Sequence, residues 1–362
     1  MQKRGVFILN VEMGKKVLVA MSGGVDSSVA ALLLKENGYD VTGVTMCLGV
    51  KSTDEKARCC GPQAIDDAKK VCYSLGIPHY VMDFSKELEE KVISKLVSEY
   101  LKGKTPNPCV DCNRFLKFGL LLRKAVGIGF DFLATGHYAR IENNNGNLVL
   151  KKAKDKTRDQ SYFLYPIQKE ALNSILFPLA GFTKQEVRQI AKRANLAVAD
   201  KPQSQDICFI QDDYRKFISE RVSDISTGHI VDLDGNIRGM HKGLFFYTVG
   251  QREKLGISNS TPLYVVSVDA QENQVIVGER KDLHARGFVV SDLNLFVDEL
   301  PREAFVKMRY TLKESKCEIL QQGSRVKAIF EEKQEAITPG QSAVFYDDDI
   351  VLGGGIIEEV IW

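Results

Sequence analysis

The segment SGGVDSS, residues 22–28, lies between a short apolar run at 17–21 and a stretch of helical character that ends before Gly38. The apolar run is too short for a helix and is bounded by glycine, so it predicts a buried strand. The two glycines let the backbone curl around an anion, and the first turn of the following helix offers N–H groups and the positive end of the helix dipole. The order is therefore strand, anion-binding loop, helix.

The same alternation continues to about residue 150. Strands are predicted at 41–48, 79–84 and 132–135, and helices at 63–75, 85–101 and 113–125, with Gly76 as a stop and Ser85 as an N-cap. Asn143-Asn144-Asn145-Gly146 predicts a hairpin turn. Strands separated by helices predict the α/β class with a doubly wound parallel sheet.

The second half of the chain no longer shows the regular alternation of strands and helices. The residues from Thr183 to Glu186 have the pattern of a capping box, which opens a helix to about Ala194. From about residue 229 short strands alternate with turns, which favours a small central β-rich module and then a C-terminal β-barrel. We expect an N-terminal extension at 1–14, a catalytic domain at 15–220, a central α+β or β-rich module at 221–285 and the barrel at 286–362.

Composition narrows the class of protein. No apolar run reaches the roughly 18 residues that span a bilayer, so we expect a cytoplasmic protein without a membrane partner. The net charge of +2 does not by itself predict a nucleic-acid partner, although clusters at 102–124 and 151–158 could bind phosphates. Eight cysteines in a cytoplasmic chain favour metal or catalytic use of some of them over a disulfide framework.

The loop at 22–28 differs from the two commonest nucleotide-binding loops. No Gly-Lys-Ser/Thr follows the glycines, and no G-x-G-x-x-G is present. Its pattern and placement resemble the pyrophosphatase loop of the PP-loop ATP pyrophosphatase superfamily, which implies cleavage of ATP to AMP and pyrophosphate. The loop alone does not choose among the members, which include amide-forming synthetases and several tRNA-modifying enzymes.

Two cysteines stand in polar loops. Cys112 precedes a predicted helix, with Arg114 and Lys117 nearby, and a helix N-terminus and basic neighbours both favour the thiolate form. Cys208 follows Gln203-Ser204-Gln205-Asp206-Ile207. Only the fold can bring two such distant cysteines together.

Five separated motifs, in this order, resemble the tRNA-specific 2-thiouridylase family. They are the NP-x-x-x-CNR of 107–114, RDQSYFL at 158–164, CFI at 208–210, YTVGQR at 247–252 and TPGQ at 338–341. Matches run from about residue 15 to 357, which is nearly the whole chain.

The resemblance implies ATP-dependent 2-thiolation of the wobble uridine of tRNA, with ATP and Mg²⁺ as the nucleotide and metal. It implies Cys208 as the carrier of a persulfide and Cys112 as the partner nucleophile, with a Cys112–Cys208 disulfide after transfer. The implied partners are tRNAs for Lys, Glu and Gln, and a sulfur donor such as a cysteine desulfurase or a sulfur-relay protein. The implied ATP-site residues are Ala20, Met21, Ser22, Gly23, Gly24, Val25, Asp26, Ser27, Met46 and Gly136. The implied tRNA-binding residues are Asn107, Pro108, Cys109, His137, Arg158, Asp159, Gln160, Arg309, Tyr310 and Gln341.

Cys109 departs from the family pattern, because many members carry an acidic residue three positions before the nucleophile. Cys109, Cys112 and Cys208 could instead hold three irons of a [4Fe–4S] cluster whose fourth iron binds sulfide. Another AMP-forming PP-loop ligase, or a non-catalytic tRNA-binding sensor, are the remaining alternatives.

Overall fold

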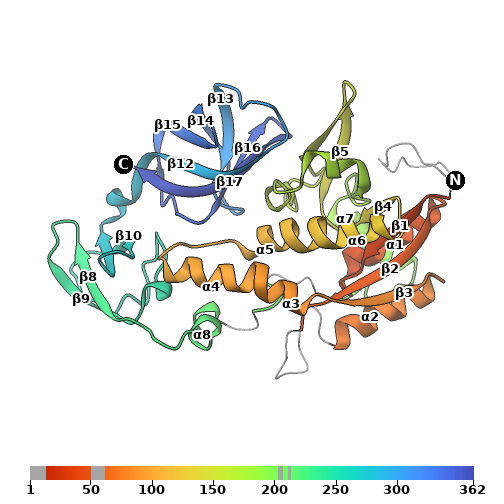
Figure 1. The fold of residues 1–362 in the computed structure, drawn as a ribbon, viewed down its shortest axis with the longest axis horizontal. Coiled ribbons are helices and arrows are strands. Elements are labelled where there is room, and N and C mark those ends of the chain that lie inside the picture. Colours follow the sequence, from red (N-terminus) through yellow and green to blue (C-terminus); the bar gives the residue numbers. More distant parts are fainter. Residues whose placement is uncertain (1–13, 50–61, 203–206, 211–212) are drawn as a thin grey trace. The chain divides into compact units, whose positions relative to one another are not determined.

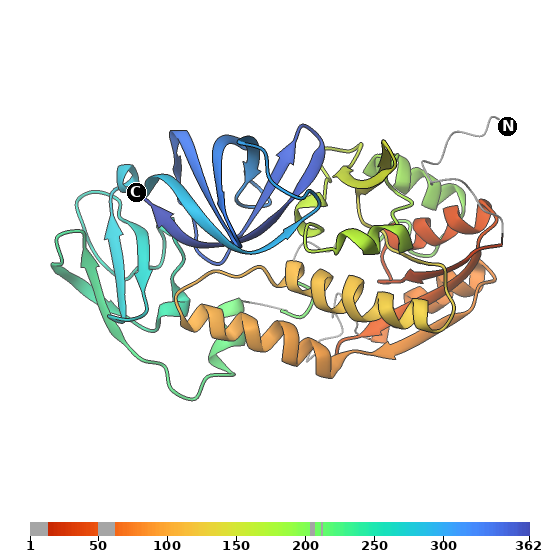
Figure 2. The ribbon, with the colours of Figure 1, turned by 45° about the horizontal axis from the view of Figure 1, so that its top comes forward.

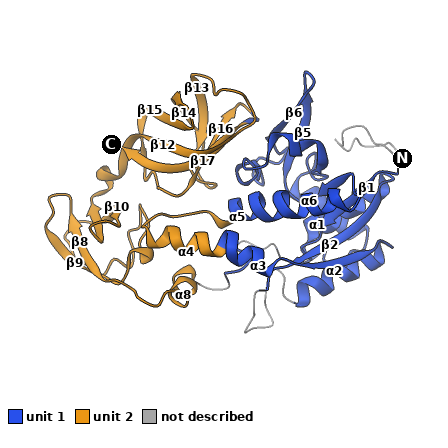
Figure 3. Cartoon of the chain, viewed as in Figure 1, with its two compact units in different colours: residues 1–92, 109–211, 349–351 blue, residues 93–108, 212–348, 352–362 orange. Residues whose placement is uncertain are grey.

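The computed structural model describes residues 14–49, 62–202, 207–210 and 213–362. The chain separates into two compact units (Figure 3). The first contains residues 1–92, 109–211 and 349–351, and the second contains residues 93–108, 212–348 and 352–362. The expected extension up to residue 13, Cys59 and Cys60, and the 203–206 segment before Cys208 lie outside the described residues.

A parallel sheet forms the centre of the first unit (Figure 1). Its strand order is β3-β2-β1-β4-β7, and every neighbouring pair is parallel. The strands are β1 Lys16–Ala20, β2 Asp40–Cys47, β3 His79–Asp83, β4 Phe132–Ala134 and β7 Ile175–Leu176. The predicted doubly wound sheet is confirmed. The edge strand β7 is missing from the sequence prediction because two residues carry no periodicity.

The helices follow the predicted alternation with two shifts in their ends. They are α1 Val25–Glu36, α2 Pro62–Ser74, α3 Ser85–Leu88, α4 Ser94–Leu101, α5 Pro108–Asp111, α6 Leu122–Gly127, α7 Lys184–Arg193 and α8 Tyr214–Ser219. π-helical turns at Glu89–Ile93 and Cys112–Leu121 make 85–101 and 108–127 continuous helical stretches. Ser85 is the first helical residue, not the N-cap, and the Asp83 carboxylate accepts its N–H at 2.8 Å. Short 3₁₀ turns span Ser161–Phe163, Lys169–Ser174, Leu244–Phe246 and Arg280–Leu283.

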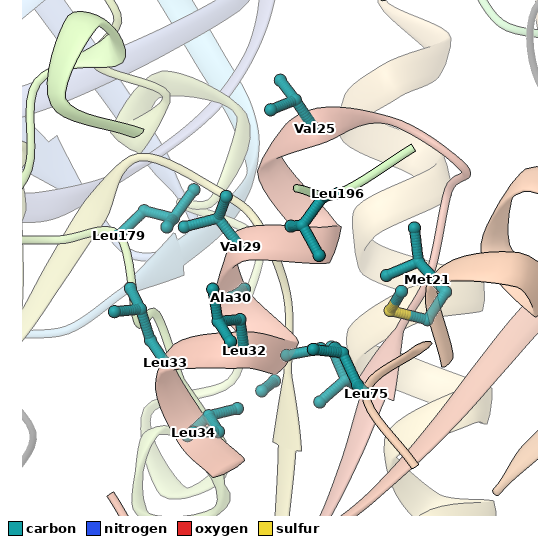
Figure 4. Packing of buried hydrophobic residues seen from close by; sticks show 14 of the residues in the cluster. Met21, Val25, Val29, Ala30, Leu32, Leu33, Leu34, Leu75, Leu179 and Leu196 are labelled. Carbon is teal, nitrogen blue, oxygen red and sulfur yellow. The ribbon is translucent and has the colours of Figure 1, made fainter. Parts of the chain in front are cut away.

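Helix α1 is buried along almost its whole surface. Val29, Ala30 and Leu34 are completely buried, and the cluster around them includes Leu179 and Leu196 (Figure 4). Each such aliphatic side chain contributes about 1.5–3 kcal/mol when it is removed from water. This packing fixes the N-terminal end of α1, and therefore the loop that leads into it.

The β-rich parts match the predicted classes. The central module is a four-stranded sheet of order β10-β11-β8-β9. Asn145 and Gly146, both with positive φ, turn a hairpin whose second strand pairs with the chain at Ile350. The C-terminal strands form a closed antiparallel barrel of order β12-β15-β14-β13-β16-β17, in which β12 also pairs with β17 (Figure 2). The remaining strands are β5 Ala139–Asn144, β6 Asn147–Lys152, β8 Gly228–Asp232, β9 Ile237–His241, β10 Tyr264–Asp269, β11 Gln274–Gly278, β12 His284–Leu295, β13 Glu303–Lys307, β14 Ser315–Gln322, β15 Arg325–Glu335, β16 Ser342–Asp347 and β17 Ile350–Ile361.

Within the described ranges, no helix combines the length and the apolar character needed to cross a bilayer.

Candidate active site

The loop at 22–28 begins just beyond the carboxyl end of β1, at the point where the strand order of the sheet reverses. Strand β1 pairs with β2 on one side and with β4 on the other. In open α/β sheets ligands bind at such a switch point, outside the carboxyl ends of the strands. The segment after β4 reaches the same place, because a Cβ on Gly136 would lie 2.7 Å from the Ser27 nitrogen. The fold thus brings Gly136 directly against the loop, and a larger residue there would push the loop away.

Serine hydroxyls give the loop its shape. Ser27 Oγ accepts the N–H of Ser22 at 3.1 Å, and Ser28 Oγ donates to the Gly24 carbonyl at 2.8 Å. Gly24 is the N-cap of α1 and has no side chain to bond the N–H groups of the first turn. Helix N-termini without side-chain caps can accept anionic oxygens. Ser22 is exposed, whereas Ser27 and Ser28 are buried.

Two features of the backbone require glycine at position 23. Its φ of +68° lies in the left-handed region, and a Cβ there would come within 2.3 Å of the Ala64 carbonyl in α2. The loop therefore rests directly on the start of α2. Any other residue at 23 would have to displace one of the two.

The Asp26 carboxylate is held by two partners from later in the chain. Lys184 Nζ lies 2.6 and 2.7 Å from its two oxygens, and the Tyr138 hydroxyl donates to it at 2.8 Å. Burial is the main cause that lowers the pKa of Lys184, and Asp26 opposes that shift. Burial, and then the Asp26 charge, raise the pKa of Tyr138, which therefore stays a neutral donor. These contacts fix the orientation of the Asp26 carboxylate at the start of α1.

A second lysine reaches the loop. Lys201 Nζ donates to the Gly23 carbonyl at 2.9 Å and lies 2.7 Å from the Asp67 carboxylate of α2. Hydrogen bonds from Lys201 and Gln63 lower the pKa of Asp67 against the opposing effect of its burial, which is the largest single cause. Lys201 therefore ties the loop to α2.

The remaining predicted ATP-site residues lie on the two central strands. Ala20 ends β1, and the next residue, Met21, is 2% exposed and donates its N–H to the Val44 carbonyl at 2.7 Å. Met46 is half-buried near the end of β2 and lies beside Met82 of β3. Met21 and Met46 both lie at the carboxyl edge of the sheet, where the loop starts.

The position of Cys112 differs from the prediction. The helical stretch begins at Pro108, so Cys112 follows the first turn rather than standing at the N-terminus. Proline is favoured at the first helical position because its missing N–H needs no partner there. The influence of the helix dipole fades within the first turn, and Cys109 is the cysteine that lies inside it. Cys112 is 6% exposed, whereas Cys109 is half-buried.

None of the six cysteines in the described part of the chain forms a disulfide, so the implied Cys112–Cys208 bond is not present in this structure. Cys208 is half-buried. Cys72 and Cys317 have structural positions, because burial raises the pKa of Cys72 to about 11 and that of Cys317 to about 12. Thiols held protonated in this way are poor nucleophiles.

The three cysteines of the iron–sulfur alternative do not form a metal site. Cys109, Cys112 and Cys208 are all described, and no group of three His, Cys, Asp or Glu residues among the described residues could hold a metal ion. A [4Fe–4S] cluster needs thiolates brought together around it. The residues present therefore do not fit the cluster.

The residues of the first unit that were predicted to touch tRNA have different surroundings. Arg158 is exposed, whereas the neighbouring Asp159 is 7% exposed and its carboxylate accepts from Ala153 N at 2.8 Å and Ser161 Oγ at 2.7 Å. Gln160 Oε1 accepts the N–H of Tyr138 at 3.0 Å. Asp159 and Gln160 therefore organise the loop that carries Arg158, and all three tRNA contacts stay predictions.

His137 is packed against aromatic rings. Its Nδ1 lies 2.7 Å from Thr135 Oγ1, and its ring centroid is 5.8 Å from that of Phe118. Burial, and then the Lys117 charge, lower the pKa of His137 well below its usual value. The imidazole is therefore neutral at physiological pH, which suits stacking or hydrogen bonding better than pairing with a phosphate.

In the second unit, two residues that were predicted to contact tRNA make hydrogen bonds to the protein backbone. Arg309 donates to the Val249 and Ala336 carbonyls at 3.2 and 3.0 Å, and Gln341 Nε2 donates to the Thr105 carbonyl at 2.8 Å. Lys307 Nζ lies 5.4 Å from the centroid of the Tyr310 ring. Asn107 is half-buried, and Pro108 is buried. Contact of these residues with tRNA stays a prediction.

Lys184, Lys201 and Tyr138 are absent from the sequence-predicted site. The capping box at Thr183 predicted where α7 begins, and both of its hydrogen bonds are present. Nothing in the sequence connects Lys184 with Asp26, since 158 positions separate them. Only the packing of α7 against α1 brings the two side chains together.

Family models match almost the whole chain. The tRNA methyl transferase HUP domain matches residues 15–212, the tRNA methyl transferase PRC-barrel domain residues 215–279, and the aminomethyltransferase beta-barrel domain residues 285–357.

Curated relatives agree over nearly their full lengths. The tRNA-specific 2-thiouridylase MnmA 1 of Syntrophus aciditrophicus (strain SB) is 55% identical over 96% of this chain and 94% of its own. The MnmA proteins of Clostridium beijerinckii and Acetivibrio thermocellus are 47% and 48% identical, over 96% and 95% of this chain and 100% and 99% of theirs. This chain therefore belongs to the tRNA-specific 2-thiouridylase family.

Proposed function

We propose that this protein is an ATP-dependent tRNA-uridine 2-sulfurtransferase that replaces the 2-oxygen of the wobble uridine with sulfur. The observation that carries the proposal is the SGGVDSS loop, placed with Asp26 and Gly136 at the switch point of a chain 55% identical to a 2-thiouridylase. We place the activity in the cytoplasm, and we propose tRNAs for Lys, Glu and Gln as substrates.

Activation of the uridine comes first. Oxide is a poor leaving group, so the uracil 2-oxygen attacks the α-phosphorus of ATP and pyrophosphate leaves, which gives an adenylated base. The N–H groups of the loop and the Ser22 and Ser27 hydroxyls, which bond each other in this structure, would bind the departing pyrophosphate. Mg²⁺ bound with ATP would screen phosphate charge, and Asp26 is the carboxylate beside the loop that could hold it.

Sulfur transfer follows. The terminal sulfur of a persulfide on Cys208 attacks C2 of the uracil, and the Cys112 thiolate attacks the inner sulfur. The S–S bond breaks with its electrons on the transferred sulfur, AMP leaves with the former 2-oxygen, and a Cys112–Cys208 disulfide forms. A thiol reductant then restores both cysteines. A persulfide donor, such as a cysteine desulfurase or a sulfur-relay protein, reloads Cys208.

The domains divide this work in our proposal. The catalytic domain spans 15–220, the central module 221–285 and the barrel 286–362, which would bind the anticodon region. Arg158, an exposed residue on a loop organised by Asp159 and Gln160, would contact a tRNA phosphate. Attack of a cysteine-bound sulfur on C2 of the uracil requires a base that is extruded from the anticodon loop.

Mass spectrometry of nucleosides tests the proposal. Protein incubated with undermodified tRNA, ATP and a persulfide donor should yield 2-thiouridine at the wobble position, with one AMP and one pyrophosphate released per thiolated tRNA. Omitting ATP should abolish the product. A tRNA-binding sensor would bind both ligands and release no pyrophosphate, and that result would exclude the enzyme.

Replacing Cys109 with Asp should leave thiolation within about threefold of wild type. On the persulfide route Cys109 does no chemistry, and many family members carry an acidic residue at this place. Turnover of 2-thiouridine measured in air is the readout, and iron content of anaerobically prepared protein is the companion measurement. Simultaneous loss of bound iron and of thiolation in this variant would overturn the persulfide route.

A further inference from the structure

The helix that carries Cys112 is not wound as an ordinary α-helix. Between α5 and α6 (Figure 1), Cys112–Leu121 form a π-helix, and the Leu122 N–H bonds to the Lys117 carbonyl, five residues back. An α-helix bonds four residues back, and π-helical turns are rare and often lie at functional sites. The proposed partner nucleophile is therefore the first residue of an unusual segment.

Gly119 allows this winding, because a side chain would not fit in its place. A Cβ there would lie 2.5 Å from the Arg114 carbonyl oxygen, which is again five residues back. That oxygen belongs to the backbone, so it cannot move aside without a change in the winding of the helix. Glycine in a helix interior is less stable than alanine, and the chain nonetheless carries one here. The π-helical winding thus depends on Gly119.

The π-helix is anchored to the rest of the first unit on both sides of Gly119. Before it, Asn113 is 2% exposed, and its Nδ2 donates to the Phe163 carbonyl at 2.9 Å. After it, Leu121 and Ala125 are completely buried. Rewinding one π-turn as an α-turn would rotate one side against the other by about 100°, the angle that one helical residue spans. Both anchors can therefore be kept only while the segment stays π-helical.

Cys112 lies on the side of Gly119 that contains the Asn113 anchor, so such a rotation would move its thiol. Attack on the inner sulfur of a persulfide needs an aligned approach, and a misplacement of about 1 Å can cost about a hundredfold in rate. We propose that Gly119 and Asn113 are positioning residues for sulfur transfer: Gly119 keeps the helix π-wound, Asn113 fixes its first turn, and together they set the direction of the Cys112 thiol. This role deepens the proposed function and rests on it.

Labelling of Cys112 with iodoacetamide tests the role on the full-length protein without tRNA. Gly119→Ala should speed labelling at least about fivefold, because a thiol that is 6% exposed becomes more accessible when it is rotated. Gly127→Ala is the matched control and should label like wild type, since Gly127 ends α6 and an added Cβ would meet nothing within 4 Å. Labelling of the completely buried Cys72, followed by mass spectrometry in the same digest, should stay slow in every folded variant.

Single-turnover kinetics separate this role from a general loss of structure. In Gly119→Ala, pyrophosphate release should stay within about threefold of wild type, whereas formation of 2-thiouridine should fall about 30- to 100-fold. Asn113→Ala removes the anchor to Phe163 but leaves Gly119 in place, and it should show the same selective loss. Thermal melting shows which variants are folded, and Asn113→Ala decides the question if Gly119→Ala does not fold.

Wild-type rates of labelling or of sulfur transfer in a folded Gly119→Ala would overturn the assignment. Equal losses in pyrophosphate release and in sulfur transfer would also overturn it, because a merely structural glycine predicts that result. If wild-type protein forms no 2-thiouridine, the proposed function fails, and the labelling of Cys112 still decides whether Gly119 positions this thiol.

Discussion

Replacing Cys208 with Ala is expected to reduce formation of 2-thiouridine by at least about a thousandfold, because no other described residue is proposed to carry the persulfide. Adenylation of tRNA, measured as pyrophosphate release in a single turnover, should persist, since the phosphate loop is untouched. Cys112→Ala should stop turnover to a similar extent by leaving the sulfur attached to Cys208. Both losses are measured as 2-thiouridine per tRNA by mass spectrometry.

Peptide mapping under non-reducing conditions complements these variants. After one turnover the wild type should show a Cys112–Cys208 link, which is absent from the resting protein. Cys317→Ala is the matched control, because Cys317 is a buried barrel cysteine whose thiol donates to the Ala304 carbonyl. Wild-type turnover in either single cysteine variant would refute the scheme.

Replacing Asp26 or Ser27 with Ala is expected to abolish pyrophosphate release, with a loss of at least about 100- to 1,000-fold. Asp26→Ala removes the carboxylate beside the loop, and Ser27→Ala removes the hydroxyl that accepts from Ser22. Binding of tRNA should stay within about threefold, because the proposed tRNA contacts lie on other segments. Pyrophosphate release and filter binding of labelled tRNA are the two measurements.

Stability provides a second readout for the loop. Asp26→Ala leaves the buried Lys184 ammonium without its carboxylate. Because the Asp26 side chain is 26% exposed, we expect a loss of about 1–2 kcal/mol in the free energy of unfolding, less than for a fully buried pair. Asp40→Asn is the control, since Asp40 is exposed at the amino end of β2 and should change neither activity nor stability. Retained thiolation in Asp26→Ala would exclude the PP-loop assignment.

Short local sequence patterns were sufficient to predict several elements of the fold. The apolar run at 17–21 and the Gly23-Gly24 pair predicted β1 and the loop, because strand burial and left-handed backbone leave marks in a few adjacent residues. Asn145-Gly146 predicted the hairpin turn, and Thr183 with Glu186 predicted the start of α7. Five short motifs in order were enough to identify the family, as the full-length relatives then confirmed.

Other features depended on tertiary structure. Helix α5 begins at Pro108 rather than beside Cys112, because a helix start is set by backbone geometry that several nearby residues satisfy equally well. The two-residue strand β7 exists only because it pairs with β4.

The partners of the Asp26 carboxylate could not be predicted from the sequence either. Lys184 and Tyr138 lie 158 and 112 positions from Asp26, and no periodicity links such distant residues. Their meeting depends on how α7 and the segment after β4 pack against α1. The sequence by itself therefore determined the loop, the order of strands and helices and the family. The packing of the sheet and its helices decided which lysine neutralises Asp26, because an ion pair between distant residues forms only when the intervening chain has folded.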